Sequence, residues 1–266
     1  MMEYAYVTTN LLDLWSDPAF NSERANQLSF GEVLQVRSLT RGFAQVVESD
    51  GYTGWTDERF LREISQEQYI RGMKSLNGFI SDGPADVFAA DTNERVSPYF
   101  LFYGTHLHLT SNSDGFITVE LPDGAIVRIK SDKSILHDDR LGQKVTGEMV
   151  VNEAMTFLGV PYLWGGITPA GFDCSGFVRT LYGAFCRYLP RDTKDQIVMG
   201  KEIARWNIQT GDLLFFDRHV GLAIGKEQII HCSMGGGGVR INSLSPSGED
   251  YRPDLDRDFR TARRVL

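Results

Sequence analysis

The sequence predicts an α+β domain at the carboxyl end of the chain, preceded by two small all-β modules. Three observations predict this fold class. Short alternating apolar segments broken by Gly, Ser, Asp and Asn fill the first half, and no long helical period occurs before about residue 145. A block of this half recurs further along the chain. Beyond it, two helical patterns precede three strand-like runs, as expected of helices beside an antiparallel sheet.

The internal repeat lies in the β-rich half. Residues 30–51 align with residues 103–124 without a gap, a shift of 73 positions. Each copy predicts strand, polar turn, strand, Asp-Gly turn and strand, because the glycine of Asp-Gly supplies the positive φ of a tight hairpin. Identical residues fall at apolar strand positions and turn glycines, and in the first copy they are Gly31, Leu34, Ser38, Gly42, Phe43, Val46, Asp50 and Gly51. We therefore predict a duplicated module.

These patterns divide the chain into four parts. The all-β modules are expected over residues 1–64 and 78–142, and both resemble bacterial SH3-like domains. The first contains GYTGWTDERFL, which is similar to the closing strand and turn of such domains, whereas the second lacks the Gly-Trp pair. A linker helix is predicted in residues 65–77 and the α+β domain in residues 143–266.

Composition argues against several classes of function. Asp and Glu number 35 against 27 Lys and Arg, and the net charge of −8 disfavours nucleic acid, which attracts clustered cations. Three cysteines without a CxxC pair predict a reduced chain. No signal peptide or long apolar run is found in the sequence, so we expect a cytoplasmic protein with no membrane partner.

The α+β domain is predicted to begin with two helices. The first starts near Thr146, and its apolar face comprises Val150, Ala154, Phe157 and Leu158. The second starts at Cys174, and its apolar positions, three and four residues apart, are Phe177, Val178, Leu181, Tyr182, Phe185 and Tyr188. Strands are predicted at residues 211–216, 219–225 and 228–233.

Cys174 stands at the start of the second helix, where backbone N–H groups favour a thiolate. A nucleophilic thiol also needs a base. If a three-residue loop pairs Gly225 with Ile229, strand parity puts His219 and His231 on one face of the sheet, whereas a two-residue loop puts them on opposite faces. On a shared face, one imidazole can take the thiol proton while the second orients the first.

Three other interpretations stay open on these residues alone. Cys174 could be a small buried residue, as most lone cysteines are. The cysteine and the two histidines could bind zinc, although their spacing shows neither CxxC nor HExxH. Each histidine could serve only a structural role, such as a hydrogen bond to a backbone carbonyl.

Five segments in order make the family resemblance. DCSGFVRTLY, LPRDTKDQ, GDLLFF, HVGLAIG and IIHCS resemble the NlpC family of papain-like cysteine peptidases, which cleave bacterial cell-wall peptides, over roughly residues 145–266. The resemblance implies a papain-like α+β domain in which Cys174 is the nucleophile, His219 the general base and His231 the polar third residue. It implies no cofactor and no metal.

The two modules ahead of this domain add to the resemblance. The arrangement is similar to that of γ-D-glutamyl-L-diamino acid endopeptidases, which cut small murein peptides with a free amino-terminal L-Ala. A substrate such as L-Ala-γ-D-Glu-diaminopimelate, a role in cell-wall peptide recycling and a monomeric enzyme are then expected. The substrate-binding residues implied are Tyr162, Trp164, Asp173 and Ser175, with Glu23 and Tyr52 from the first module. By its chemistry, Asp173 suits either a terminal ammonium or a helix N-cap.

Other functions compete with this one. An exported hydrolase acting on stem peptides of the wall is the alternative within the same class. A binding module with a degenerate peptidase-like domain is a second class, but Cys174, His219 and His231 are all present. An acyltransferase using the same residues is a third.

Overall fold

A computed structural model describes residues 2–142 and 144–266 of the chain. It comprises two compact units, Met1–Asp139 and Arg140–Leu266. The predicted domain boundary at residue 143 lies outside the described residues. Within the described part of the chain, no helix is long and apolar enough to cross a membrane.

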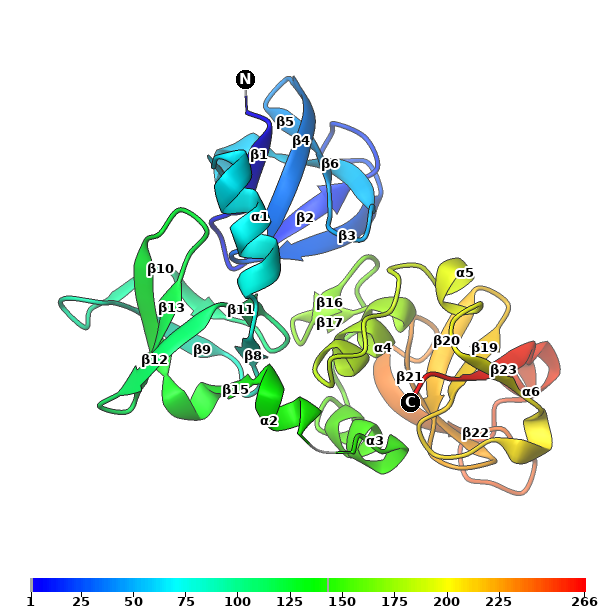
Figure 1. Ribbon diagram of the computed structural model, residues 1–266. Helices are drawn as coiled ribbons and strands as arrows, with labels where there is room; N and C mark the ends of the chain where they lie inside the picture. The colour runs from blue at the N-terminus through cyan, green and yellow to red at the C-terminus, as the bar shows by residue number, and fades with distance from the viewer. Residues whose placement is uncertain (1, 143) are drawn as a thin grey trace. The chain divides into compact units, whose positions relative to one another are not determined.

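The first module of the amino-terminal unit is one antiparallel seven-stranded sheet in the order β3-β2-β6-β5-β4-β1-β7 (Figure 1). Its apolar strand positions point into a core that includes Leu14, Leu28 and Leu34. The strands are β1 (Tyr4–Val7), β2 (Leu11–Trp15), β3 (Arg24–Ser29), β4 (Val33–Thr40), β5 (Phe43–Val47), β6 (Thr53–Asp57) and β7 (Leu61–Glu63), with the 3₁₀ turn η1 (Glu58–Phe60) before β7.

The second module has a five-stranded sheet, β10-β9-β14-β13-β12, and a three-stranded sheet, β11-β8-β15. Its proline-containing segment passes through cis peptide bonds before Pro84 and Pro98. The strands are β8 (Gly78–Ile80), β9 (Ala85–Ala89), β10 (Arg95–Leu101), β11 (His106–Leu107), β12 (Leu109–Ser113), β13 (Phe116–Glu120), β14 (Ile126–Lys130) and β15 (Ser134–Leu136), with the 3₁₀ turn η2 (Ser131–Lys133) before β15.

The predicted duplication is confirmed element by element. Strands β5, β6 and β7 and turn η1 recur as β13, β14, β15 and η2, each with the same bounds shifted by 73 residues. The backbone repeats as well, because Gly51 and Gly124 share a φ of +88°. The closing strand of the second module therefore forms without the Gly-Trp pair, since strand alternation and the Asp-Gly turn are sufficient to specify the hairpin.

Helix α1 (Gln66–Ser75) confirms the predicted linker helix, and it does more than connect the modules. Ser65 caps it, accepting from the N–H of Gln68, while the Gln68 side chain accepts from the N–H of Ser65. Tyr69 is buried in a core that both modules share. At the surface of that core, the Tyr6 hydroxyl donates to Asp123 at 2.9 Å, and Arg62 pairs with the same carboxylate at 3.0 Å. The two modules thus form one unit.

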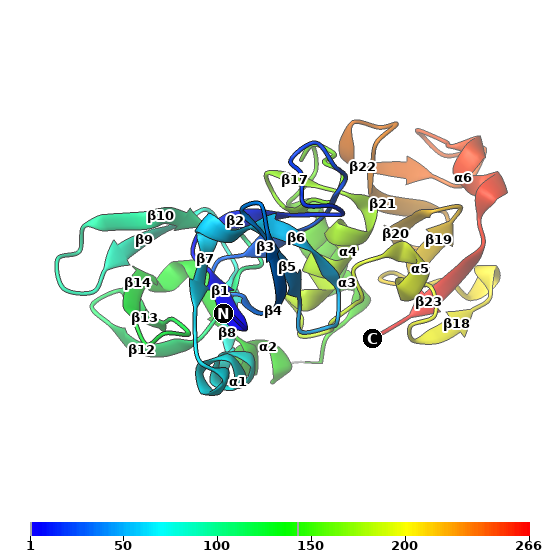
Figure 2. The same cartoon turned by 90° about the horizontal axis from the view of Figure 1, so that it is seen from above.

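The carboxy-terminal unit is built on a six-stranded antiparallel sheet in the order β18-β23-β19-β20-β21-β22, whose strands lie side by side in Figure 2. Helix α2 (His137–Leu141) leads into it. The elements are α3 (Gly147–Met155), β16 (Ile167–Thr168), β17 (Gly171–Phe172), α4 (Cys174–Gly183), α5 (Thr193–Gln196), β18 (Lys201–Ile203), η3 (Arg205–Asn207), β19 (Leu213–Phe216), β20 (His219–Ala223), β21 (Gln228–Ser233), β22 (Gly238–Ser243), α6 (Pro253–Asp258) and β23 (Thr261–Arg264).

Helix α4 packs on β20 and β21 through an apolar face that matches the prediction up to Phe185. Two predicted apolar positions were wrong. Tyr188 is 64% exposed because α4 ends at Gly183 and the chain then turns, with Cys186 at a φ of +55°. Leu158 is 48% exposed because α3 ends at Met155, three residues before it.

The three predicted strands are confirmed as β19, β20 and β21. The expectation of helices first and sheet afterwards was incomplete. Short strands β18 and β23 extend the sheet on one side and β22 on the other, while α6 lies between β22 and β23 in the sequence. Strands β18 and β23 carry too few residues for a recognisable period.

Equivalent turns of the two modules should respond equally to substitution. A Cβ built at Gly51 or Gly124 meets no atom within 4 Å, so only backbone strain opposes a side chain there. We expect Gly51→Ala and Gly124→Ala each to lower the free energy of unfolding by about 1 kcal/mol, measured by chemical denaturation. Gly→Asn at the same positions should cost less, because Asn tolerates a positive φ. If only one of the two alanine variants lost stability, the two turns would not be equivalent.

Candidate active site

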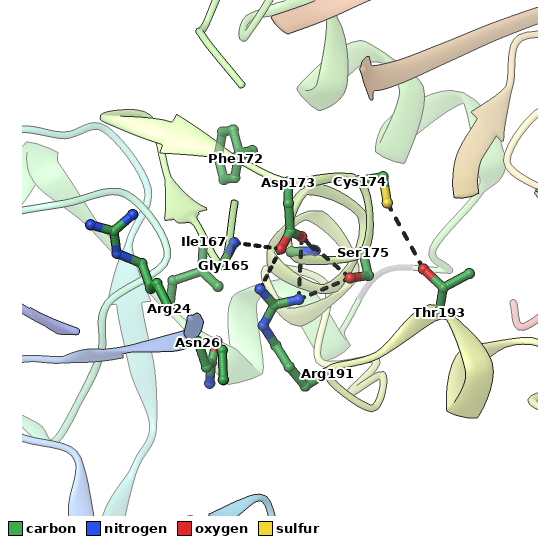
Figure 3. Close-up of polar contacts among 12 residues, drawn as sticks. Arg24, Asn26, Gly165, Ile167, Phe172, Asp173, Cys174, Ser175, Arg191 and Thr193 are labelled. Atoms are coloured by element: carbon green, nitrogen blue, oxygen red, sulfur yellow. Dashed lines mark hydrogen bonds and ion pairs between the residues drawn. The ribbon is translucent and has the colours of Figure 1, made fainter. Parts of the chain in front are cut away.

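Cys174 is the first residue of α4, and its position follows from the cap before it. Strand β17 leads into Asp173, whose extended backbone and carboxylate close the helix start by accepting from the N–H of Gly176 at 2.7 Å. The backbone N–H groups of Ser175 and Val220 donate toward the Cys174 sulfur. The Thr193 hydroxyl lies 3.9 Å from it (Figure 3).

The helix start does not by itself produce a thiolate. Cys174 is only 9% exposed, and burial, followed by the negative charge of Asp173, raises the pKa of its thiol. The donors at Val220, Thr193 and Ser175 oppose this shift without reversing it. The expectation of a lowered thiol pKa was therefore wrong, and the thiol needs a neighbouring base to take its proton.

His219 and His231 meet directly, nitrogen to nitrogen. His219 opens β20, and its Nε2 lies 2.6 Å from Nδ1 of His231 in β21. The predicted shared face is thus confirmed, although the predicted pairing of Gly225 with Ile229 was wrong. Ala223 pairs with Ile229, so the three-residue loop sits one residue earlier in the chain. If only one strand were displaced by one residue, the two histidines would point to opposite faces of the sheet. Here the loop is displaced by one residue on both strands, so the histidines still share a face.

The strand partner of His231 has to be small. A Cβ at Gly221 would lie 2.8 Å from Cβ of His231 and 2.5 Å from Cδ1 of Ile229. The glycine in the segment HVGLA therefore leaves the space in which His231 reaches His219.

The side chain of Asn242 forms a hydrogen bond with His231. Nε2 of His231 lies 2.9 Å from Oδ1 of Asn242 in β22, and Nδ2 of Asn242 donates to the carbonyl of Asp250 at 3.0 Å. His231 is fully buried and Asn242 nearly so. Burial lowers the pKa of both histidines below the ordinary value of 6.5, so the pair is neutral at neutral pH. A neutral imidazole such as that of His219 is suited to act as a base.

Asp173 lies in a buried network on the other side of Cys174 (Figure 3). Its Oδ2 accepts from Arg191 at 2.5 Å and from the N–H of Gly165 at 2.9 Å, while Oδ1 accepts from Arg191 at 3.2 Å. Ser175 donates to Asp173 at 3.2 Å and accepts from Arg191 at 2.8 Å. The N-cap interpretation of Asp173 is confirmed, and both predicted polar neighbours of the nucleophile are engaged within the protein. Their roles toward substrate stay predictions.

The two predicted aromatic residues precede α4. Tyr162 is half-buried, and its N–H donates to the carbonyl of Gly237 at 3.2 Å. Burial, then the charge of Cys174, raises the pKa of its hydroxyl, which is therefore protonated and able to donate a hydrogen bond. Trp164 is 52% exposed. Their substrate-binding roles also stay predictions.

Glu23 and Tyr52 belong to the first module, where the structure brings their segments together. Tyr52 precedes β6, and its hydroxyl lies 3.5 Å from the carbonyl of Ala25, two residues after Glu23. Tyr52 packs against the module's core and Glu23 is exposed. A role for either toward substrate stays a prediction.

Sequence reasoning missed Arg191, Thr193 and Asn242. Arg191 and Thr193 lie in LPRDTKDQ, where a single arginine gives no sign that it is buried. Asn242 alternates with apolar residues in GVRINS, so a strand could have been predicted there by its period of two. Its contact with His231 depends on the register of β21 with β22, which pairs Asn242 with Ile229.

The zinc interpretation finds no support in this geometry. Among the described residues 2–142 and 144–266, no three His, Cys, Asp or Glu side chains are grouped to hold a metal ion. The facing nitrogens of His219 and His231 are joined by a hydrogen bond, so those two atoms cannot both ligate one ion.

Comparisons with known proteins place this geometry in context. Residues 159–253 match the model of the NlpC/P60 family, and residues 14–59 match that of the bacterial dipeptidyl-peptidase SH3 domain. The gamma-D-glutamyl-L-lysine dipeptidyl-peptidase of Bacillus subtilis (strain 168) is 29% identical over 82% of this chain and 75% of its own length. A probable endopeptidase of Haemophilus influenzae is 33% identical over 43% of this chain and 77% of its own length.

A solved structure extends the likeness to the whole chain. The crystal structure of an NlpC/P60 family protein from Bacillus cereus ATCC 10987 superposes with a TM-score of 0.81, at 23% identity and with 99% of both chains covered. The predicted fold, a papain-like α+β domain after SH3-like modules, is thereby confirmed.

Asp173 and Arg191 form a buried ion pair, and we expect the loss of one partner to destabilise the protein more than the loss of both. We expect Arg191→Met to lower the free energy of unfolding by about 3–5 kcal/mol, because it leaves the Asp173 carboxylate buried without a counterion. The double variant Asp173→Asn/Arg191→Met should recover a large part of that loss. Chemical denaturation of the single and double variants measures the coupling, and additive effects would contradict it.

The buried histidines should destabilise the protein in mild acid. The unfolded chain binds a proton at each histidine below about pH 6.5, whereas the folded pair resists protonation, so the free energy of unfolding falls as the pH drops through this value. The slope contributed by His231 is at most about 1.4 kcal/mol for each pH unit. Denaturation of wild type and His231→Gln at pH 7.5 and 5.0 isolates this contribution, and equal slopes would refute it.

Proposed function

This chain belongs to the NlpC/P60 family, and we propose that it is a cysteine peptidase that hydrolyses the bond between γ-D-glutamate and a diamino acid in small murein peptides. The substrate has a free amino-terminal L-Ala, as in L-Ala-γ-D-Glu-diaminopimelate. The observation that carries the chemistry is the hydrogen-bonded pair of His219 in β20 and His231 in β21, because Val220, the residue after His219, directs its N–H at the Cys174 sulfur.

The reaction follows from these groups. His219 takes the thiol proton, and the Cys174 thiolate attacks the γ-carbonyl carbon of D-glutamate. The tetrahedral intermediate collapses as His219 returns the proton to the leaving amine, which releases the diamino acid and leaves a thioester on Cys174. A water molecule, deprotonated by His219, then hydrolyses the thioester. His231 keeps the imidazole of His219 oriented through both steps.

The oxyanion of the intermediate forms beside the start of α4. A helix amino terminus presents backbone N–H groups that stabilise developing negative charge. The protonated Tyr162 hydroxyl is a second candidate donor. Both groups belong to the folded protein before substrate binds, so little reorganisation is required.

Two findings support the finer specificity. The relative from Bacillus subtilis is named for the γ-D-glutamyl bond, and the first module matches the SH3 domain of bacterial dipeptidyl-peptidases. An enzyme that removes a dipeptide must recognise the amino terminus two residues from the cleaved bond, and an ammonium group calls for an anionic partner. We propose that Glu23 and Tyr52 bind the amino-terminal end of the substrate. Asp173 is a weaker candidate because Arg191 already neutralises it.

We place this activity in the cytoplasm, in the recycling of released wall peptides. The alternative is an exported hydrolase that acts on stem peptides of the intact wall. Fractionation of the cells that make the protein, followed by detection with an antibody, distinguishes the two locations.

The substrate proposal is tested with purified protein and L-Ala-γ-D-Glu-diaminopimelate. We expect release of diaminopimelate, detected by mass spectrometry, and at least a hundredfold slower release from the amino-terminally acetylated peptide, because acetylation removes the ammonium charge. Equal rates would refute the free-amine requirement. The lysine peptide, assayed beside it, reports which diamino acid is preferred.

The nucleophile has its own control. Cys174→Ala should release no product, whereas Cys186→Ala, a cysteine beyond the end of α4, should retain wild-type turnover. Product from Cys174→Ala would refute the assignment of the nucleophile.

A further inference from the structure

We propose that Asn242 is a positioning residue that fixes the tautomers of His231 and His219, so that Nδ1 of His219 is the nitrogen that accepts the thiol proton. The inference rests on the proposed function only in taking Cys174 as the thiol that His219 serves. It follows from the order of donors and acceptors along four groups, which begins at a backbone carbonyl and ends at the catalytic base.

The order begins at Asp250. A carbonyl oxygen can only accept, so the Asn242 atom 3.0 Å from it must be the NH₂ group. The same carbonyl also accepts from the N–H of Ser243 at 3.2 Å, and the N–H of Arg252 donates to the carbonyl of Ser243 at 2.9 Å. The segment around Asp250 is thus held against β22. The orientation of the Asn242 amide is set by the backbone.

The next step is His231. Because the NH₂ group of Asn242 faces Asp250, its carbonyl oxygen faces Nε2 of His231 at 2.9 Å, and that nitrogen must carry a hydrogen. A neutral imidazole has one N–H, so Nδ1 of His231 is an acceptor. Full burial of the ring keeps it neutral.

The last step is His219. The Nδ1 acceptor of His231 lies 2.6 Å from Nε2 of His219, so Nε2 of His219 carries the hydrogen and Nδ1 keeps its lone pair. When this lone pair accepts the thiol proton, His219 becomes an imidazolium and its Nε2–H continues to donate to His231. No other proton has to move. The positive charge forms next to an acceptor that is already oriented.

Charged side chains near the histidine pair do not disturb this order. Arg240 of β22 and the neighbouring Arg252 and Asp254 all act on the pKa of His231, and Arg252 and Asp254 also act on that of His219. Arg252 and Asp254 pair with each other at 2.6 Å, which leaves little net charge between them. Asn242 is the group that contacts Nε2 of His231 directly.

Removing the Asn242 amide should make the imidazolium harder to form. In Asn242→Ala, Nε2–H of His231 becomes a buried donor without its acceptor. The tautomer of His231 with its hydrogen on Nδ1 is then favoured. That tautomer cannot accept from a protonated His219. We therefore expect the thiolate of Cys174 to appear at a pH about one unit higher than in wild type. The value of kcat/KM on the murein peptide should fall about ten- to a hundredfold, with KM little changed.

The decisive measurement is the rate of Cys174 alkylation by iodoacetamide as a function of pH, followed by mass spectrometry of the peptide that carries Cys174. It requires no substrate, so an error in the proposed substrate would not affect it. Asn242→Asp provides the opposite case. A carboxylate still accepts from Nε2 of His231 and favours a nearby cation, so its alkylation profile should shift to lower pH. Both variants lose the bond to Asp250 and should be less stable.

A purely structural role predicts a different pattern. Ser243→Ala, on the same strand, removes a buried hydroxyl that bonds Glu227 and Ser245, and it should lower stability with an unchanged alkylation profile. If Asn242→Ala and Asn242→Asp shift the profile in the same direction, or if neither shifts it, the proposal is overturned. For the wild-type protein, long-range ¹H–¹⁵N spectra should show His231 protonated at Nε2 and bare at Nδ1. The reverse tautomer would also overturn it.

Discussion

The carboxylate of Asp173 is the constraint on which the catalytic unit depends. It accepts hydrogen bonds from two backbone N–H groups, one hydroxyl and both terminal nitrogens of Arg191. These contacts join the loop at Gly165, the first turn of α4 and the segment before α5. The charge is tolerated in a buried place because the guanidinium matches it in two-pronged geometry. Cys174 follows this anchored carboxylate in the chain, and burial, with the charge of Asp173 as the second cause, raises the pKa of its thiol.

Because the pKa of the Cys174 thiol is raised, the groups proposed to deprotonate it stand on the sheet and not at the helix start. Because the helix start does not ionise Cys174, the thiol needs a base, and the proposed base His219 must keep one ring nitrogen unprotonated to accept the proton. Neighbouring antiparallel strands supply the necessary series, since His219, His231 and Asn242 stand on β20, β21 and β22 in turn. Each side chain contacts the next at hydrogen-bond distance, and the last contacts a backbone carbonyl. Strand pairing thereby determines which groups of the series donate and which accept.

The amino-terminal unit shows how a duplicated module becomes one body. The copies keep the same bounds for β5, β6 and β7 and for β13, β14 and β15, and the same turn glycines, yet their strands are paired into different sheets. Apolar residues of both modules, with Tyr69 of α1, form a common core. The pairing of Asp123 with Tyr6 and Arg62 joins the turn of one module to strands of the other. Neither module's alternation of apolar residues predicts this association, because the residues concerned are single positions in separate strands.

Local patterns in the sequence determined the elements of this protein and the chemistry they carry. The repeat, the Asp-Gly turns, the cap before Cys174 and the alternation around His219 and His231 act over a few residues, so they can be read along the chain. The shared face of the two histidines followed only for a three-residue loop, and the structure decided that loop length. What only the tertiary structure decided were the partners of single polar residues. Arg191, Thr193 and Asn242 acquire their roles from side chains distant in sequence, and burial reversed the expected shift of the Cys174 pKa. A lone polar residue has no period, so its environment is set by packing alone.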